Sequence, residues 1–164
     1  MKTLSESEIR ASFGGCTSGE RKRLRIPDFA EVDWDSLDFL SWISRSNAQT
    51  GYLVSTDDDG RITGLVLHAT TPGNSPTKQS MCSLCRTVHS LGGVTLFSTT
   101  KWSEAGRHGD TVGDYICTDL SCSAYVRGLK QTGRTQMPVT LTVNEKIAEL
   151  QLYTALFVER AKRG

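Results

Sequence analysis

The first element that the pattern of polar and apolar positions predicts is a short helix near the N-terminus. Ser5 and Glu8 have the spacing of a capping box, and Leu4 and Ile9 have the spacing of a hydrophobic staple. Gly14-Gly15 follows soon afterwards and disfavours continuation of the helix. We therefore predict a helix that begins after Ser5 and stops before Gly14.

A β-hairpin is predicted in the next part of the chain. Residues 52–54 and 61–68 flank Asp58-Asp59-Gly60, a strong signal for a tight turn between two strands. Between the first helix and this hairpin, residues 33–40 are typical of a turn or short helix that packs Trp34, Leu37 and Leu40 inward. Beyond the hairpin we predict a loop marked by Pro72, Gly73 and Pro76.

The second half of the chain predicts two more strands and two helices. The strands cover residues 94–97 and 112–116, with a polar loop between them. A short helix is expected from Asp119, as its N-cap, to about Lys130, with a packing face made by Leu120, Tyr125 and Val126. A longer helix starts at a second capping box, Thr142 with Glu145. Its apolar positions recur at helical spacing: Ile147, Leu150, Tyr153 and Phe157.

Composition narrows the class of protein without naming it. The chain has 164 residues, with 19 Lys+Arg against 18 Asp+Glu and a formal charge of +1. This near balance excludes a strongly basic nucleic-acid coat and an acidic disordered tail. No stretch approaches the length of a membrane span, and the N-terminus has no apolar region of a secretory signal. We expect a soluble, cytoplasmic protein with a single domain over 1–164, made of an N-terminal portion (1–76) and a second portion (77–164).

Four of the five cysteines form two pairs with metal-ligand spacing. Cys82 and Cys85 form a C-x2-C pair, and Cys117 and Cys122 form a C-x4-C pair. In a reducing compartment such pairs favour metal ligation over disulfides. Four thiolates complete a tetrahedral zinc site and leave no open position, which is typical of a structural site. The cofactor that we expect is therefore one structural Zn²⁺.

Other interpretations of the cysteines remain open at this point. An iron–sulfur centre also uses four thiolates, and spacing does not distinguish the two metals. Unrelated buried cysteines and a redox C-x2-C pair are weaker alternatives, the latter because its usual βαβ context is missing. His89 and His108 are alternative metal ligands in case one of the four cysteines does not bind the ion. Cys16 is left over, and we expect a free or partly buried thiol there.

The predicted elements around the cysteines have a recognisable order. A turn carries the first pair, two strands follow, and the second pair straddles the start of a helix. Knuckle, β-hairpin and helix in this order make a treble clef. We therefore predict an α+β fold: a treble-clef zinc finger, with an additional N-terminal helix and β-hairpin region and a C-terminal helix.

The residues of this predicted finger resemble a known family. The runs 81–85, 113–117 and 122–128 are similar to the C-terminal treble-clef zinc-finger domain of elongation factor G-binding proteins of the fusidic acid resistance type. The start of the chain, residues 8–13 with Cys16 and Gly19-Glu20, resembles short stand-alone members. The resemblance implies zinc on Cys82, Cys85, Cys117 and Cys122, and binding to elongation factor G that helps release the factor from drug-stalled ribosomes. In the resistance proteins a helical bundle precedes this domain, whereas in this chain the 81 residues before Cys82 predict one helix and strands. The zinc fold therefore transfers, and full resistance activity does not.

Three classes of function follow from these observations. The first is a non-enzymatic module that binds elongation factor G. Its candidate contacts are exposed, mostly basic residues: Lys101, Arg107, His108, Tyr125, Arg127, Lys130 and Arg134. The second is a zinc-finger module that binds RNA or the ribosome through its basic stretches, residues 21–25 and 127–134. The third, an enzyme, is disfavoured because no catalytic motif occurs and a closed thiolate site leaves zinc no position for substrate water.

Overall fold

The structure is a computed structural model, and it describes residues 1–30, 32–70, 80–90, 92–102, 106, 108–133, 136 and 140–163. All five cysteines fall within these ranges. The loop predicted at Pro72, Gly73 and Pro76 lies outside the described residues, as do the candidate contacts Arg107 and Arg134.

Capping boxes define the helices of the N-terminal part. Helix α1 (Glu6–Ala11) begins at the Ser5–Glu8 capping box, as predicted, and Leu4 and Ile9 pack in one core cluster. A second helix, α2 (Ser18–Arg23), was not predicted, although Thr17 and Glu20 form the same kind of box at its start. A short 3₁₀ turn, η1 (Trp34–Ser36), confirms the turn expected in residues 33–40.

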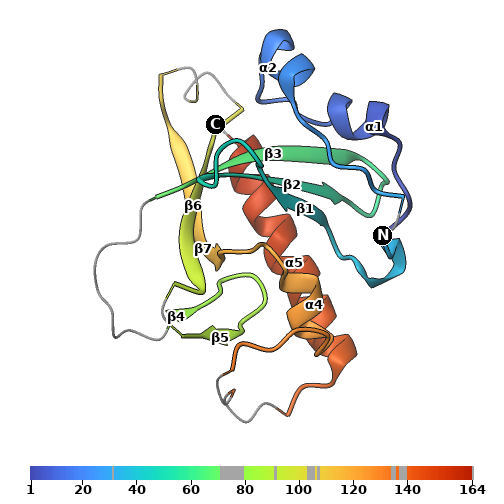
Figure 1. Ribbon diagram of the computed structural model, residues 1–164, viewed down its shortest axis with the longest axis vertical. Coiled ribbons are helices and arrows are strands. Elements are labelled where there is room, and N and C mark those ends of the chain that lie inside the picture. Colours follow the sequence, from blue (N-terminus) through green and yellow to red (C-terminus); the bar gives the residue numbers. More distant parts are fainter. Residues whose placement is uncertain are drawn as a thin grey trace.

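One antiparallel sheet of five strands forms the centre of the molecule (Figure 1). Its order is β1-β2-β3-β6-β7, with β1 at Leu40–Ile43, β2 at Thr50–Thr56, β3 at Ile62–Ala69, β6 at Val94–Thr100 and β7 at Thr111–Cys117. The predicted β2–β3 and β6–β7 strands are confirmed. Gly60 takes a left-handed conformation (φ 80°) in the β2–β3 turn, where a side chain would be strained. The edge strand β1 was not predicted.

The β3–β6 pairing joins the N-terminal strands to the strands of the finger. His68 lies opposite Ser98, and Ala69 opposite Phe97. The main-chain N–H of Thr70 continues the ladder by donating to the Leu96 carbonyl at 2.9 Å. The zinc-finger hairpin is therefore an extension of the N-terminal sheet.

Two further strands and two further helices lie in the described part of the chain. The short strands β4 (Ser80–Met81) and β5 (Val88–His89) pair beside the main sheet. Helix α5 (Val143–Lys162) begins at the predicted Thr142–Glu145 box and runs behind the sheet in Figure 1. Helix α4 (Cys122–Val126) is shorter than expected. The prediction of Asp119 as its N-cap is wrong: Ser121 holds that position, and Asp119 instead accepts a hydrogen bond from the Ser121 main-chain N–H at 3.1 Å.

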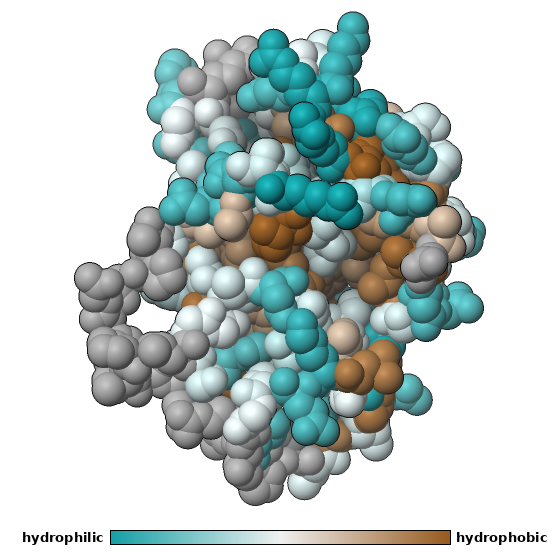
Figure 2. Space-filling model, in the orientation of Figure 1, coloured by the Kyte–Doolittle hydropathy of each residue, from teal (hydrophilic) through white to brown (hydrophobic). Residues whose placement is uncertain are grey.

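The sheet separates two apolar cores, because successive strand residues point to opposite faces. On β3, Leu65 and Leu67 pack with Leu150 and Phe157 of α5, while Val66 packs on the other side with the cluster around Phe13. In Figure 2 apolar side chains surface only as separate patches among hydrophilic ones on the face that is shown. No helix in the described part of the chain is long and apolar enough to cross a membrane.

Candidate metal centre

The first cysteine pair lies in the tight turn between β4 and β5. The Cys82 main-chain N–H donates to the Thr87 carbonyl, and the Arg86 N–H donates to the Cys82 carbonyl, both at 3.0 Å. The Cys85 N–H points at the Cys82 sulfur, 3.5 Å away. Arg86 adopts a left-handed conformation (φ 59°). The turn therefore directs both sulfurs to the same side.

The second pair joins the end of a strand to the start of a helix. Cys117 is the last residue of β7 and Cys122 the first of α4. Between them, Leu120 is left-handed (φ 56°) and donates its N–H to the Cys117 carbonyl at 2.8 Å, while its side chain is buried in the core. A hydrogen bond from the Ser83 N–H to the Tyr115 carbonyl (2.7 Å) ties the first turn to β7.

These two turns bring four buried sulfurs together. The Sγ atoms of Cys82, Cys85, Cys117 and Cys122 all lie within 4.8 Å of one another. Two Sγ–Sγ distances are 3.7 Å (Cys82–Cys122) and 3.4 Å (Cys85–Cys117), and no disulfide joins them. A tetrahedral zinc with Zn–S bonds of about 2.3 Å places its sulfurs about 3.8 Å apart. The four cysteines therefore cluster as a metal site, as the spacing predicted, and their donor set fits tetrahedral coordination by zinc.

The electrostatics of the four thiols favour ionisation of one of them. Hydrogen bonds from the Cys117, Cys122 and Cys85 thiols lower the pKa of Cys82. Hydrogen bonding with Cys117, Cys82 and Cys85, followed by burial, raises the pKa of Cys122. A cluster of this kind gains further thiolates when a dication neutralises their mutual repulsion.

His89 lies beside the four sulfurs and contacts Cys117. Its Nε2 lies 3.2 Å from the Cys117 sulfur, and the residue is 3% exposed. Burial lowers the pKa of the imidazole. Gly93 packs against the ring so closely that a Cβ there would come within 2.7 Å of Nδ1. His89 is thus positioned to orient the Cys117 sulfur, whereas the other alternative ligand, His108, is exposed.

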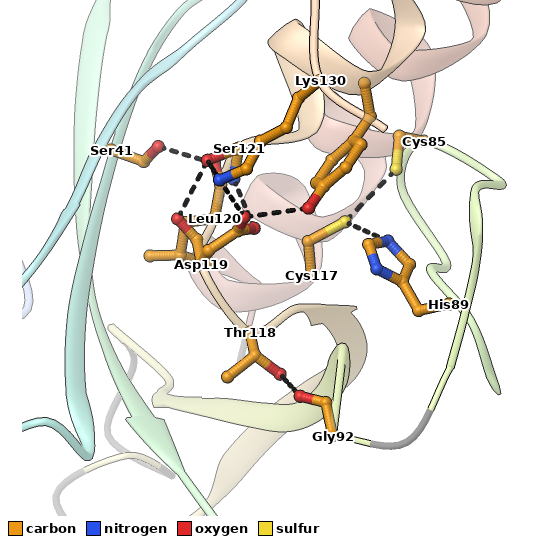
Figure 3. A network of polar contacts seen from close by, with 11 residues as sticks. Ser41, Cys85, His89, Gly92, Cys117, Thr118, Asp119, Leu120, Ser121 and Lys130 are labelled. Atoms are coloured by element: carbon orange, nitrogen blue, oxygen red, sulfur yellow. Dashed lines mark hydrogen bonds and ion pairs between the residues drawn. The ribbon is translucent and has the colours of Figure 1, made fainter. Parts of the chain in front are cut away.

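A polar network extends from the cluster to the surface (Figure 3). Tyr125 packs edge-on against His89, with ring centroids 4.8 Å apart, and its hydroxyl donates to Asp119 at 3.0 Å. Lys130 donates to the same carboxylate at 2.6 Å. Burial opposes ionisation of Asp119, but hydrogen bonds from Lys130, Ser121 and Tyr125 outweigh it and lower the carboxyl pKa. The network fixes the turn that carries Cys117 and Cys122.

The predicted contact residues do not form one surface. Tyr125, Arg127 and Lys130 all line a groove of about 720 Å³ next to Cys85. Lys101 and His108 flank the other end of the β6–β7 hairpin. In the strand register the Val94–Cys117 pair and the Thr100–Thr111 pair are six residue steps apart, or about 20 Å.

Arg127 uses its side chain in a largely buried ion pair, whereas the ion pair of Lys130 with Asp119 is exposed to solvent. The Nη2 of Arg127 lies 3.1 Å from Oδ1 of Asp38, and the two side chains are 17% and 2% exposed. The groove also has basic residues that the sequence analysis missed, Arg86 and Lys146. They lie far from Lys130 in the sequence, and only the fold brings them to the same groove.

Fold and site together define a zinc-finger protein of the treble-clef class. The chain belongs to the FBP C-terminal treble-clef zinc-finger family, whose sequence model matches residues 8–161. Among solved structures it is similar to the fusidic acid resistance protein FusC, with a TM-score of 0.56 and 20% identity. That match covers 75% of this chain and 52% of the FusC chain, so the present chain spans about half of that structure. Among curated proteins no match was found.

Proposed function

We propose that this protein is a non-enzymatic zinc protein that binds translation elongation factor G and modulates its release from the ribosome. The buried four-cysteine cluster carries the proposal, because it lies in a chain of the FBP treble-clef family. The resemblance seen in the sequence supports elongation factor G as the partner. The similar fold of a protein named for fusidic acid resistance supports a role related to that resistance. We propose a cytoplasmic location, since elongation factor G acts in translation.

The proposed role of the metal is structural, with one zinc ion per chain. Four thiolates complete a tetrahedral shell, so no position remains for substrate or for a reactive water. The four cysteines would hold the ion between the β4–β5 turn, the end of β7 and the start of α4. The first of these turns (Cys85, Arg86 and Thr87) and the end of α4 (Tyr125 and Val126) line the groove beside Cys85. We therefore infer that zinc shapes a docking surface and takes no part in catalysis.

We propose this groove as the docking surface. Its charged lining is four basic residues (Arg86, Arg127, Lys130 and Lys146) against one acid, Glu149. Tyr125 adds an aromatic side chain of the kind that is enriched in interfaces. Such a lining is complementary to an acidic patch on a protein surface. Lys101 and His108 are about 20 Å away along the hairpin and can contact the partner only across a broad interface.

Binding is tested by titrating purified elongation factor G with the zinc-loaded protein in a calorimeter. The variant Lys130→Glu/Lys146→Glu should weaken binding at least about tenfold, since like charges across an interface cost energy. Because Lys130 also pairs with Asp119, the zinc content and melting temperature of the variant are measured alongside. Arg61→Glu is the matched control, because Arg61 lies in the exposed β2–β3 turn. No heat of binding at tens of micromolar protein would contradict the proposal.

A parallel titration with a labelled ribosomal RNA fragment tests the alternative function, a module that binds RNA or the ribosome. If the groove binds RNA instead, affinity for the fragment should fall steeply with salt and depend on the same two lysines. Binding to the fragment alone, with none to elongation factor G, would replace the proposed partner by the ribosome itself.

A further inference from the structure

The edge strand of the sheet leaves main-chain groups unpaired. Strand β1 is the first in the sheet order, and among the described residues it pairs with β2 alone. The Ser44 N–H donates to the Thr50 carbonyl at 2.8 Å, and Trp42 lies opposite Tyr52, two residues back in the same ladder. Hydrogen-bonded pairs alternate in an antiparallel ladder, so Ile43 directs its N–H and C=O away from β2. This edge is a template for a further strand.

A groove of about 550 Å³ runs along this edge, and it shares no lining residue with the groove beside Cys85. Strand β1 supplies Trp42 and Ile43, and the segment after α2 supplies the facing wall. The floor is apolar, with Leu24, Ile26 and Pro27 beside Ile43. The charged lining is three arginines, Arg10, Arg25 and Arg45, against one acid, Asp28.

Two of these arginines are available to a ligand. Arg10 is occupied: it pairs with Glu6 at 2.7 Å and donates to the Arg21 carbonyl at the end of α2. Arg25 and Arg45 are exposed, and neither forms an ion pair with any described acid. Asp28 accepts a hydrogen bond from the Ala30 N–H at 3.0 Å. The groove therefore favours an anionic ligand.

Trp42 indicates which kind of anionic ligand fits. Its Nε1–H is buried and has no hydrogen-bond partner among the described residues, so an acceptor is missing there. Its ring is already packed, stacked on Tyr52 at 4.9 Å and edge-on to Phe29 at 5.8 Å. Single-stranded nucleic acid needs an open aromatic face on which bases stack. The covered ring, the aliphatic floor and the open strand edge suit a peptide better.

We propose that this groove binds an extended acidic peptide segment of a partner protein, which adds as a sixth strand along β1. Main-chain hydrogen bonds to Ile43 supply affinity, as in other cases of strand addition. Arg25 and Arg45 select carboxylate side chains, and an acceptor on the peptide satisfies the Trp42 indole N–H. This site is separate from the groove proposed for elongation factor G, so each proposal can fail alone.

The test uses the zinc-loaded full chain and a fluorescein-labelled decapeptide of alternating glutamate and valine, followed by fluorescence anisotropy. Saturable binding is expected, and the corresponding lysine–valine peptide should bind at least about tenfold more weakly. Arg25→Gln/Arg45→Gln should weaken binding about fivefold or more, whereas the exposed Arg61→Gln should not change it. The same peptide N-methylated at its central residues should lose binding, because it can no longer donate to the strand edge.

Three results would overturn the proposal. One is no saturation with the glutamate–valine peptide at millimolar concentration. Another is unchanged affinity of the Arg25→Gln/Arg45→Gln variant, whose circular dichroism spectrum and melting temperature serve as the folding control. The third is tight binding of labelled oligouridine that depends on the same two arginines, which would make the groove a nucleic-acid site.

Discussion

Arg86 and Leu120 are the two non-glycine residues with left-handed backbones in the described part of the chain, and each lies next to the cysteines. Arg86 follows Cys85, and Leu120 lies between Cys117 and Cys122. This conformation costs an ordinary residue about 1–2 kcal/mol. The cost is offset by the turn hydrogen bonds and, at Leu120, by burial of the side chain. The strained backbone at Arg86 and Leu120 thus lies in the two turns that bring the four sulfurs together.

The contact between His89 and Cys117 gives a prediction at the residue scale. Replacing His89 by Phe keeps a ring in the buried site but removes the nitrogen 3.2 Å from the sulfur. Losing such a partner of a metal ligand should weaken zinc affinity by about tenfold or more. Competition with a chromophoric chelator measures this, with His108→Phe as the exposed control. Equal zinc affinity in both variants would show that His89 only fills space.

At the scale of elements, short helices depend on their ends. Helices α1, α2 and α5 all begin with a capping box, and α2 has no buried residue among its six. Because the six-residue helices α1 and α2 are marginal on their own, side-chain caps and tertiary contacts must hold them. Because α2 buries no residue, it depends mainly on hydrogen bonds at its two ends. The Thr17–Glu20 box caps its N-terminal end, and Arg10 of α1 donates to the Arg21 and Leu24 carbonyls at its C-terminal end.

The box at α5 predicts a pH-dependent effect. Hydrogen bonds from the Thr142 main chain and hydroxyl lower the pKa of Glu145 below its unfolded value. The stabilisation is therefore complete above the unfolded pKa, near 4.3, and is lost as the pH falls through the folded value. Glu145→Ala should lower the melting temperature at about pH 7 and have little effect at about pH 3. Thermal melts of the wild type and of Glu145→Ala across this pH range measure the effect, with Glu149→Ala as a control on the same helix. A difference in melting temperature between wild type and Glu145→Ala that persisted at about pH 3 would contradict the account.

The sequence predicts elements best where a short-range signal marks them. Capping boxes located the starts of α1 and α5, and Asp58-Asp59-Gly60 located the β2–β3 turn. Helix α2 was missed because it has the box but no apolar face to give it a helical period. Strand β1 was missed because four residues are too few to show alternation, and its place in the sheet depends on pairing with β2.

The metal centre likewise has some features that local sequence patterns predict and others that only the fold determines. Its four cysteines follow from spacing alone, since sulfur pairs separated by two and four residues have few other uses. Other features of the site depend on contacts between distant parts of the chain. These are the packing of His89 against Cys117 and the position of Arg86 and Lys146 in the groove with Lys130. No local pattern in the sequence carries that information.

At the scale of the whole molecule, one buried ion pair links three segments. Asp38, which precedes β1, pairs with Arg127 beside α4 and accepts a hydrogen bond from Gln151 of α5 at 3.1 Å. The Asp38 main-chain N–H also donates to Ser123 at 3.0 Å. These contacts fasten the N-terminal sheet to the metal-binding half. Arg127 is therefore a structural residue as well as part of the groove.

Removing the arginine should destabilise the protein strongly. Arg127→Ala leaves the Asp38 carboxylate buried and unpaired, which costs about 3 kcal/mol or more. Removing both partners in Asp38→Ala/Arg127→Ala should cost less than the single change, because no charge remains buried. Urea denaturation measures both, and Arg61→Ala, whose ion pair is exposed, should change stability by less than about 1 kcal/mol. A single variant as stable as the double would refute this role.

The central claim is that one zinc ion on four cysteines organises the fold. Its most direct test is elemental analysis of the purified protein, combined with a thermal melt before and after a strong chelator. The account predicts one zinc per chain, loss of cooperative melting of residues 82–130 when the metal is removed, and the same loss in Cys117→Ser. Cys16→Ser, the fifth cysteine, should retain both metal and stability. A melting temperature that stays the same once the metal is shown to be gone, or a Cys16→Ser variant as damaged as Cys117→Ser, would contradict it.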